Sequence, residues 1–179
     1  VPGDESVAAA YSLTLTVSTH ESVEALCRAS AGSRPLRVHM KIDTGMGRLG
    51  FLPSDAVSAS LRLQENGIFV DGIFTHLATA DEIDTAYALS QLQRFAEVRA
   101  ALSEAGLRPR WYHVGNTAGI KQSFPDECNM ARSGIGIYGY SPSPALAENA
   151  PVVPAMSWRA HVVSVRRLPA GSFISYGAT

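Results

Sequence analysis

Lysine is scarce in this chain. Its 179 residues include two lysines, Lys41 and Lys121, against thirteen arginines. Any reaction that needs a lysine amine of this chain must therefore use Lys41 or Lys121. Cysteine is as rare, and Cys27 and Cys128 lie too far apart in the sequence to form the spacing of a metal site. We expect both to be buried thiols in a protein of a reducing compartment.

An excess of charge of one sign and long apolar runs are also lacking. The formal net charge is −1, which provides no basic surface for nucleic acid or for an anionic membrane. No apolar run is long enough to span a bilayer, and the acidic opening from Val1 to Glu5 does not resemble a signal peptide. We therefore expect a cytoplasmic protein without a nucleic-acid or membrane partner. Hydrophobic residues make up 46% of the chain, which is typical of a globular protein.

Short apolar runs alternate with helical patterns along most of the chain. We expect strands at 13–17, 36–42, 68–76, 109–114 and 129–140, with helices between them at 18–32, 54–67, 84–106 and 118–122. This alternation predicts an α/β fold with parallel strands. Five strand–helix units do not by themselves distinguish a barrel from an open sheet, but in both folds ligands bind at the C-terminal ends of the strands.

The pattern changes near Tyr140, where prolines become frequent. We expect three parts: the α/β domain at 1–140, a linker at 141–155, and the start of a β-rich domain at 156–179. The last prediction rests on Val162, Val163 and Val165, because β-branched residues favour strands.

The most distinctive motif runs from Lys41 to Gly50. A short apolar stretch leads there into a loop that contains three glycines and carries Arg48. Glycine adopts backbone angles that other residues avoid, so such a loop can hold one cation at a fixed point. An ordinary strand-to-helix turn explains a lone motif of this kind equally well. Three further polar clusters decide in favour of a site.

Two of these clusters follow expected strands. His76 ends one strand and can lay its ring against a planar ligand, although a hydrogen-bonded structural histidine is the simpler interpretation. Asn116 and Thr117 follow His113 at the start of a helix, where a hydroxyl and backbone N–H groups suit a phosphate. Plain capping of the helix by either residue is the alternative.

The third cluster places Arg132 in an apolar segment that continues into Gly134 and Ile135. A buried arginine is costly unless it is paired, and the alternative is a position at a surface edge. Gly134 lets backbone N–H groups approach an anion closely. A phosphate cradle, a ring-stacking histidine and arginines on two sides together outline a site for a flat, phosphorylated, heteroaromatic cofactor. Pyridoxal phosphate fits this description.

Four motifs make the chain resemble the alanine racemase family from about Tyr11 to Thr179. They are Lys-Ile-Asp-Thr-Gly-Met-Gly-Arg-Leu-Gly, Thr-His-Leu-Ala-Thr-Ala-Asp, Ala-Arg-Ser-Gly-Ile-Gly-Ile-Tyr-Gly and Ser-Tyr-Gly-Ala-Thr. The resemblance implies an enzyme that uses pyridoxal phosphate to interconvert L- and D-alanine, which supplies D-alanine for peptidoglycan. It also implies a partial (β/α)8 barrel of about the last five units, followed by the start of a β domain, in a head-to-tail homodimer.

The resemblance assigns the cofactor contacts residue by residue. His76 matches the histidine that stacks on the pyridine ring, and Arg132 matches the arginine that bonds the pyridine nitrogen. Thr117, Gly134 and Ile135 match the phosphate contacts, and Asn116 joins them as a cofactor-binding residue.

It also assigns roles around the reacting atoms. Arg48 matches the arginine near the cofactor's phenolic oxygen and the substrate carboxylate, and Lys41 matches a lysine, often carbamylated, that orients this arginine. His113 matches a histidine behind the arginine that bonds the pyridine nitrogen. Tyr176 matches the tyrosine that is one of two acid/base groups and reaches the partner subunit's site.

The arginine at 132 bears on the type of reaction. A guanidinium does not give up its proton and so leaves the pyridine nitrogen unprotonated, which weakens the electron sink and limits side reactions. Decarboxylases of the same fold class carry a glutamate there, so Arg132 favours a racemase.

The lysine that forms a Schiff base with the cofactor has no match in this chain. The first strand–helix units of the family and most of its β domain are also missing, so we expect the chain alone to be an inactive fragment. A non-catalytic pyridoxal-phosphate-binding barrel is one alternative, although such proteins end after the barrel and lack the segment that contains Tyr176. A racemase of another amino acid, such as serine, is the other.

Overall fold

The computed structural model describes residues 5–30, 35–123, 128–148 and 151–173. The elements follow one another as α1 (Glu5–Tyr11), β1 (Thr14–Val17), α2 (His20–Ser30), β2 (Arg37–Lys41), η1 (Pro53–Asp55), α3 (Ala56–Glu65), β3 (Phe69–Phe74), α4 (Ala86–Glu104), β4 (Trp111–His113), α5 (Thr117–Gln122), η2 (Ile135–Tyr138) and η3 (Pro144–Leu146). The first four predicted strands and all four predicted helices are therefore present, and α1 is an addition to the prediction.

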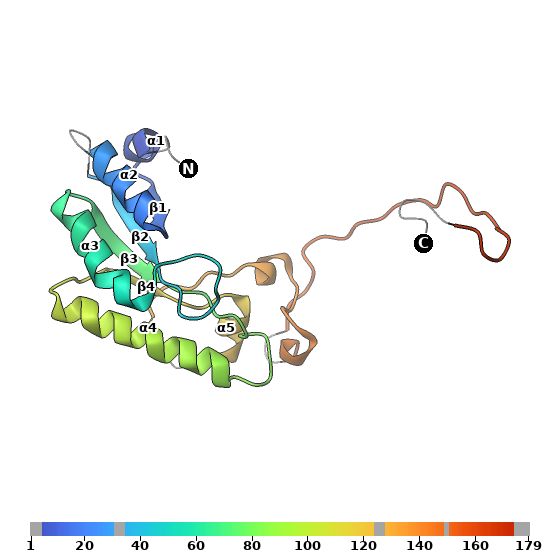
Figure 1. Ribbon diagram of the computed structural model, residues 1–179. Coiled ribbons are helices and arrows are strands. Elements are labelled where there is room, and N and C mark those ends of the chain that lie inside the picture. The colour runs from blue at the N-terminus through green and yellow to red at the C-terminus, as the bar shows by residue number, and fades with distance from the viewer. Residues whose placement is uncertain (1–4, 31–34, 124–127, 149–150, 174–179) are drawn as a thin grey trace.

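The four strands form one parallel sheet in the order β1-β2-β3-β4. Each strand pairs with the next one along the chain, and the registers join Thr14 to Arg37, Arg37 to Phe69 and Gly72 to Trp111. Right-handed crossovers that always step in the same direction place every connecting helix on the same face of the sheet. Figure 1 shows α2, α3 and α4 side by side along the sheet. This arrangement is an arc of a (β/α) barrel, since a doubly wound sheet carries helices on both faces.

The core lies between the sheet and these helices. Val38 and Met40 of β2 are fully buried there, together with Leu63 of α3 and Phe95 of α4. Because successive side chains of a strand point to opposite faces, His39 and Lys41 lie on the other face, which is the inside of the barrel arc. The inside of the arc therefore carries polar side chains, and it leads up to the C-terminal ends of the strands.

The fifth predicted strand, at 129–140, does not form. The backbone N–H groups of Asn129 and Arg132 do donate to Tyr112 and Gly115, so the segment begins alongside β4. Beyond that point the N–H groups of Gly134 and Gly136 donate to the Thr117 hydroxyl instead of to a neighbouring strand, and the chain turns into η2. The described residues thus contain four strands of the barrel.

The predicted strand within 156–168 is also absent from the described part of the chain. Residues 151–173 are exposed and carry no strand (Figure 1). A strand needs a partner for its backbone groups, and among the described residues 156–168 no strand pairing is present; the N–H of Ala155, just before them, donates to the carbonyl oxygen of Tyr138. The three-part division at 140 and 155 stays a prediction. Of the two cysteines, Cys27 is buried as expected and Cys128 is half-buried.

Among the helices of the described residues, none combines the length and the apolar character that crossing a bilayer requires.

Candidate cofactor-binding site

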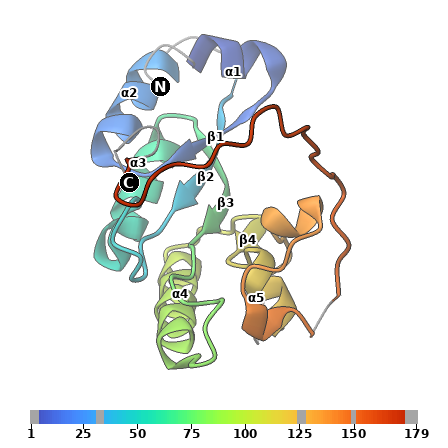
Figure 2. The ribbon, with the colours of Figure 1, turned by 90° about the vertical axis from the view of Figure 1, so that its right-hand side faces the viewer.

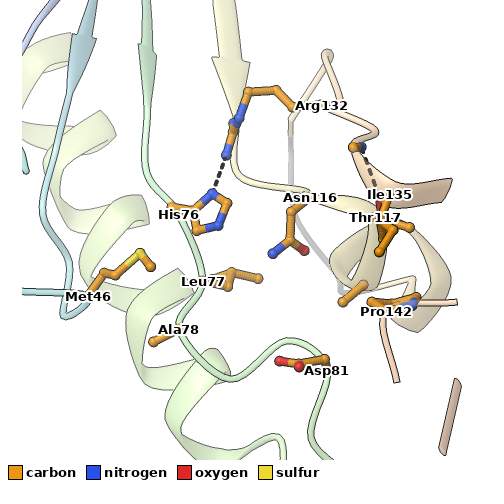
Figure 3. Close-up of a pocket in the computed structure, with 12 residues that line it drawn as sticks. Met46, His76, Leu77, Ala78, Asp81, Asn116, Thr117, Arg132, Ile135 and Pro142 are labelled. Carbon is orange, nitrogen blue, oxygen red and sulfur yellow. Dashed lines mark hydrogen bonds between the residues drawn. The ribbon is translucent and has the colours of Figure 1, made fainter. Parts of the chain in front are cut away.

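A pocket of about 360 Å³ lies where β3 and β4 end, a volume within the usual range of small-molecule sites. Its lining residues come from the segments that follow β2, β3 and β4 and from the segment 132–142 (Figure 3). They are Met46, His76, Leu77, Ala78, Asp81, Asn116, Thr117, Ala118, Arg132, Gly134, Ile135 and Pro142. The structure therefore brings together six of the residues predicted from the sequence: His76, Asn116, Thr117, Arg132, Gly134 and Ile135.

Arg132 connects its own segment to the C-terminal ends of β3 and β4 through its guanidinium. Nη1 donates to Nδ1 of His113 at 2.7 Å and to the carbonyl oxygen of His113 at 3.2 Å. Nη2 donates to the carbonyl oxygen of Thr75 at 2.8 Å, to Nδ1 of His76 at 3.2 Å and to the carbonyl oxygen of Val114 at 3.3 Å. Both Nη groups are thus committed to the protein. The interpretation of Arg132 as a surface edge residue is wrong.

The same contacts define the protonation of the two histidines. Arginine has only donors, so Nδ1 of His76 and Nδ1 of His113 must both accept. Each ring is then neutral and carries its proton on Nε2. Burial and the charge of Arg132 lower the pKa of His76, and the same two causes, with His39, lower the pKa of His113 to about 3. Both rings are neutral at physiological pH for this reason.

His113 is held from a second side by an aromatic ring. Phe74 of β3 stacks on it, with the ring centroids 4.6 Å apart and the planes 6° from parallel. The guanidinium carbon of Arg132 lies 5.1 Å from the centre of the Phe74 ring, which is within the range of a cation–π contact. Burial lowers the pKa of Arg132, because it disfavours the charged form. The contacts with His113, His76 and Phe74 offset this cost.

Thr117 forms the opposite wall of the pocket. Its Oγ1 accepts from the N–H of Gly134 at 2.9 Å and from the N–H of Gly136 at 3.3 Å. A hydroxyl has two acceptor positions and one proton, so the proton is left to donate. No acceptor for it is found within the described parts of the chain. A Cβ at Gly136 would lie 2.8 Å from Cγ2 of Thr117, so the loop reaches this hydroxyl only with glycine there.

Asn116 caps α5, as the simpler interpretation predicted. Its Oδ1 accepts from the N–H of Gly119 at 2.8 Å. This bond uses the side-chain oxygen and fixes the start of the helix, and with it the position of Thr117. Asn116 still lines the pocket through the rest of its side chain.

The glycine loop after β2 is rigid, but it does not bring Arg48 into the pocket. Oδ1 of Asp43 accepts from the N–H groups of Gly45, Met46 and Gly47 at 2.8–3.1 Å. Burial raises the pKa of Asp43, but these three bonds outweigh it and hold the pKa below its usual value. Arg48 is exposed and is not part of the lining. Its predicted role stays a prediction.

Lys41 lies beneath this loop, on the inside of the arc. Its side chain is buried, and Nζ donates to the carbonyl oxygen of Ile42 at 3.1 Å. Burial is the main cause that lowers the pKa of Lys41 to about 8, against the attraction of Asp43 and with the repulsion of Arg132 and Arg48. The amine is therefore easier to deprotonate than that of an ordinary lysine.

Gln91 of α4 supports the site and was not predicted. It is fully buried. Its Oε1 accepts from the N–H of Ala78 at 2.8 Å, and its Nε2 donates to the carbonyl oxygen of His76 at 3.1 Å and to Oγ1 of Thr44 at 3.4 Å. Gln91 thus joins the loop that carries His76 to the loop that carries Arg48. A buried glutamine on a helix gives no signal in the sequence that separates it from an exposed one.

Tyr176, the predicted acid/base group, lies outside the described residues. Within those residues, no group of three or more histidine, cysteine and acidic side chains is placed to hold a metal ion.

Comparison with known proteins gives a consistent result. Residues 1–142 match the family model described as alanine racemase, N-terminal domain. An alanine racemase of Symbiobacterium thermophilum is 38% identical over 180 residues, which cover 99% of this chain and 48% of that protein. An alanine racemase of Streptococcus pneumoniae is 39% identical over 179 residues, with 98% and 48% covered. The chain thus spans about half the length of the curated relatives it matches.

Solved structures agree with these relatives. The alanine racemase from the D-cycloserine producer Streptomyces lavendulae superimposes with a TM-score of 0.84 at 30% identity, over 99% of this chain and 49% of that chain. The alanine racemase from Bacillus anthracis with bound L-Ala-P gives a TM-score of 0.82 at 32% identity, over 99% and 47%. The prediction of a partial (β/α) barrel is confirmed.

Proposed function

The chain belongs to the alanine racemase family, and we propose that it is the cofactor-holding part of a racemase that interconverts L- and D-alanine with pyridoxal phosphate. The observation that carries this proposal is the fixed guanidinium of Arg132, which bonds both His76 and His113 at the wall of the pocket. As in the sequence-based prediction, the product is D-alanine for peptidoglycan, made in the cytoplasm by a homodimer.

The pocket fits pyridoxal phosphate at both ends. The hydroxyl of Thr117 retains a proton to donate, and the N–H of Ile135, the first residue of η2, has no partner within a helix. These donors suit the phosphate. At the other end Arg132 uses Nη1 and Nη2 for the protein, which leaves Nε–H for the pyridine nitrogen. His76 offers the face of a neutral ring between the two ends.

When bound, pyridoxal phosphate supplies the electron sink for removal of the Cα proton of alanine. Arg132 keeps its own protons during this reaction, because even a lowered guanidinium pKa leaves it charged. It therefore bonds the pyridine nitrogen without protonating it, and this weakens the sink. A weak sink favours return of the proton to Cα over side reactions.

The proton itself requires a group on each side of Cα. We assign one side to Tyr176, which the family resemblance places in the partner subunit's site. The ordinary pKa of tyrosine is about 10, so its action as a base requires positive charge nearby. Arg132 provides such a charge.

The second group is an amine, and neither lysine of this chain lies at the pocket. Nζ of Lys41 bonds the carbonyl oxygen of Ile42, and Nζ of Lys121 bonds the carbonyl oxygen of Leu146 at 3.2 Å. Neither lysine is among the lining residues. We therefore propose that the 179 residues alone do not racemise alanine, and that the amine belongs to the half of the family's length that this chain does not span.

Racemisation assays on two proteins test the proposal. The 179-residue chain and a longer protein, which adds the missing first strand–helix units of a family member before this chain and the rest of its β domain after it, are each incubated with L-alanine and pyridoxal phosphate. We expect D-alanine from the longer protein only. Serine in place of alanine tests the alternative substrate. Rapid racemisation by the chain alone would contradict the assignment of the amine, and inactivity of a folded, cofactor-loaded longer protein toward alanine would contradict the function.

A further inference from the structure

A second histidine lies behind His113, on the inside of the barrel arc. His39 is on β2, and its Nδ1 is 2.8 Å from Nε2 of His113. The two ring centroids are 5.0 Å apart, with the planes tilted by 50°. His39 is half-buried and is not among the residues that line the pocket, and neither the pocket nor the family motifs assign it a role.

The direction of this hydrogen bond follows from Arg132. Because Arg132 has only donors, Nδ1 of His113 accepts. A neutral imidazole that accepts at one nitrogen carries its proton on the other, so Nε2 of His113 donates and Nδ1 of His39 accepts. The reverse direction would make His113 accept at both nitrogens, which no neutral ring can do. The chain of bonds therefore runs in one direction, from Arg132 through His113 to His39.

The charges around His39 agree with this arrangement. Burial lowers the pKa of His39, while Asp71 on β3 opposes this effect. Asp71 is itself paired with Arg37 at 3.3 Å, which limits its pull on the ring. A neutral His39 has the free lone pair on Nδ1 that the bond from His113 requires.

The space for the His39 ring is provided by Gly72. This glycine is paired with His39 across β2 and β3. A Cβ at Gly72 would lie 2.8 Å from Cδ2 and Nε2 of His39, and its φ is not in the left-handed region. Glycine is therefore required here because a side chain would clash with the His39 ring, and not because of the backbone conformation.

We propose that His39 is a positioning residue that acts through His113 on Arg132. It gives the buried Nε2–H of His113 an acceptor, and so keeps the ring in the one orientation that turns Nδ1 toward Arg132. Without this acceptor the unpaired donor favours rotation of the ring, and Arg132 then loses the shortest of its side-chain contacts. The consequence for the pyridine nitrogen rests on the proposed function, but the hydrogen bonds themselves do not.

The bond is tested directly by nuclear magnetic resonance on the 179-residue chain with 15N-labelled histidine. A proton shared in an N–H···N bond gives scalar coupling between the two nitrogens. We expect the proton on Nε2 of His113 to show coupling to Nδ1 of His39. A proton on Nδ1 of His39 coupled to Nε2 of His113, or no coupling in the folded chain, would overturn the proposal.

Two substitutions of similar size then separate positioning from packing. In His39→Asn the side-chain oxygen lies near the place of Nδ1 and accepts, whereas His39→Leu has no acceptor. With 15N-labelled arginine, we expect the separate Nη–H signals of Arg132 to persist in wild type and in His39→Asn and to be lost by exchange broadening in His39→Leu. Equal signals in both variants would contradict a positioning role. If His39→Leu does not fold, loss of the signals in folded His39→Asn gives the same contradiction.

Titration with pyridoxal phosphate keeps the two proposals apart. Failure of the wild-type chain to bind the cofactor, with the histidine coupling present, would count against the proposed function alone. Cofactor binding without the coupling would count against His39 alone.

Discussion

The guanidinium of Arg132 donates to Nδ1 of His113 across 2.7 Å, the shortest of its side-chain contacts. This contact requires a neutral histidine, and it holds a cation whose second Nη group bonds His76. Figure 2 shows that β3 and β4, the strands that precede His76 and that carry His113, lie next to each other. The orientation of the cation is therefore set by the sheet itself.

Reversal of the charge at 132 will raise the pKa of His113. In wild type the charge of Arg132 is the second cause, after burial, that brings this pKa to about 3. Arg132→Glu removes the repulsion and adds a carboxylate that favours the protonated ring. Titration of the His113 ring by nuclear magnetic resonance will show the upward shift, and Arg166→Glu, on the exposed segment, is the control. An unchanged titration of His113 would contradict the geometry.

Loss of the Gln91 side-chain amide will destabilise the chain. Gln91→Leu leaves the N–H of Ala78 and the carbonyl oxygen of His76 without their partner, and each lost hydrogen bond costs about 0.5–1.5 kcal/mol. Urea denaturation measures the change. The matched control is Gln93→Leu, because Gln93 is exposed on the same helix and bonds its neighbour Glu97. Equal loss in the two variants would show that Gln91 does not join the loops.

Acid will weaken the fold before most carboxylates are protonated. The pKa of His113 is about 3 in the folded chain, whereas an unfolded histidine has a pKa of about 6.5. Below about pH 6.5 the unfolded chain binds more protons than the folded chain. The contribution of His113 to the free energy of unfolding is therefore full above about pH 6.5 and falls as the pH decreases toward about 3. Each such histidine contributes a slope of about 1.4 kcal/mol per pH unit.

The free energy of unfolding, measured by urea between these pH values, checks this prediction. His113→Asn retains an acceptor for Arg132 but does not titrate, so its slope will be smaller than that of wild type. His161→Asn, on the exposed segment, is the control and will keep the wild-type slope. A slope that is the same in all three proteins would exclude His113 as a source of the effect.

Lys41 will react with carbon dioxide in preference to Lys121. Carbamylation requires the neutral amine, and the pKa of Lys41 is about 8. The neutral fraction rises as the pH increases toward this value, so we expect more carbamate near pH 8 than near pH 6. Addition of 13C-labelled bicarbonate will give a carbamate signal that Lys41→Arg removes and Lys121→Arg retains. A signal that depends on Lys121, or none at all, would contradict the prediction for Lys41.

The sequence predicted the lining of the pocket because polar residues stand out at the ends of apolar strands. His76, Thr117 and Arg132 were found in this way. The fifth strand was wrong for a reason that lies in tertiary structure: the hydroxyl of Thr117 captures the N–H groups of Gly134 and Gly136 from a segment distant in sequence. The local sequence of the segment 129–140 does not predict these hydrogen bonds.

The sequence did not predict the supporting residue His39, for a related reason. His39 alternates with buried apolar residues in β2, as any polar residue on the second face of a strand does. Its role depends on Gly72 and His113 of two neighbouring strands, and their register is known only from the sheet. Arg48 shows the opposite case, since a conspicuous motif led to a residue that the structure leaves exposed.

Binding of the cofactor's phosphate is the most direct test of the central claim, that this chain holds pyridoxal phosphate between Thr117 and Arg132. The measurement is titration of the chain with pyridoxal phosphate, followed by 31P nuclear magnetic resonance. Thr117→Val removes the donor at the pocket, and Ser58→Ala, on the exposed side of α3, is the control. We predict a saturable bound phosphate signal in wild type and in Ser58→Ala that is weakened at least several-fold in Thr117→Val. A folded wild-type chain without saturable binding, or equal binding by all three proteins, would contradict the claim.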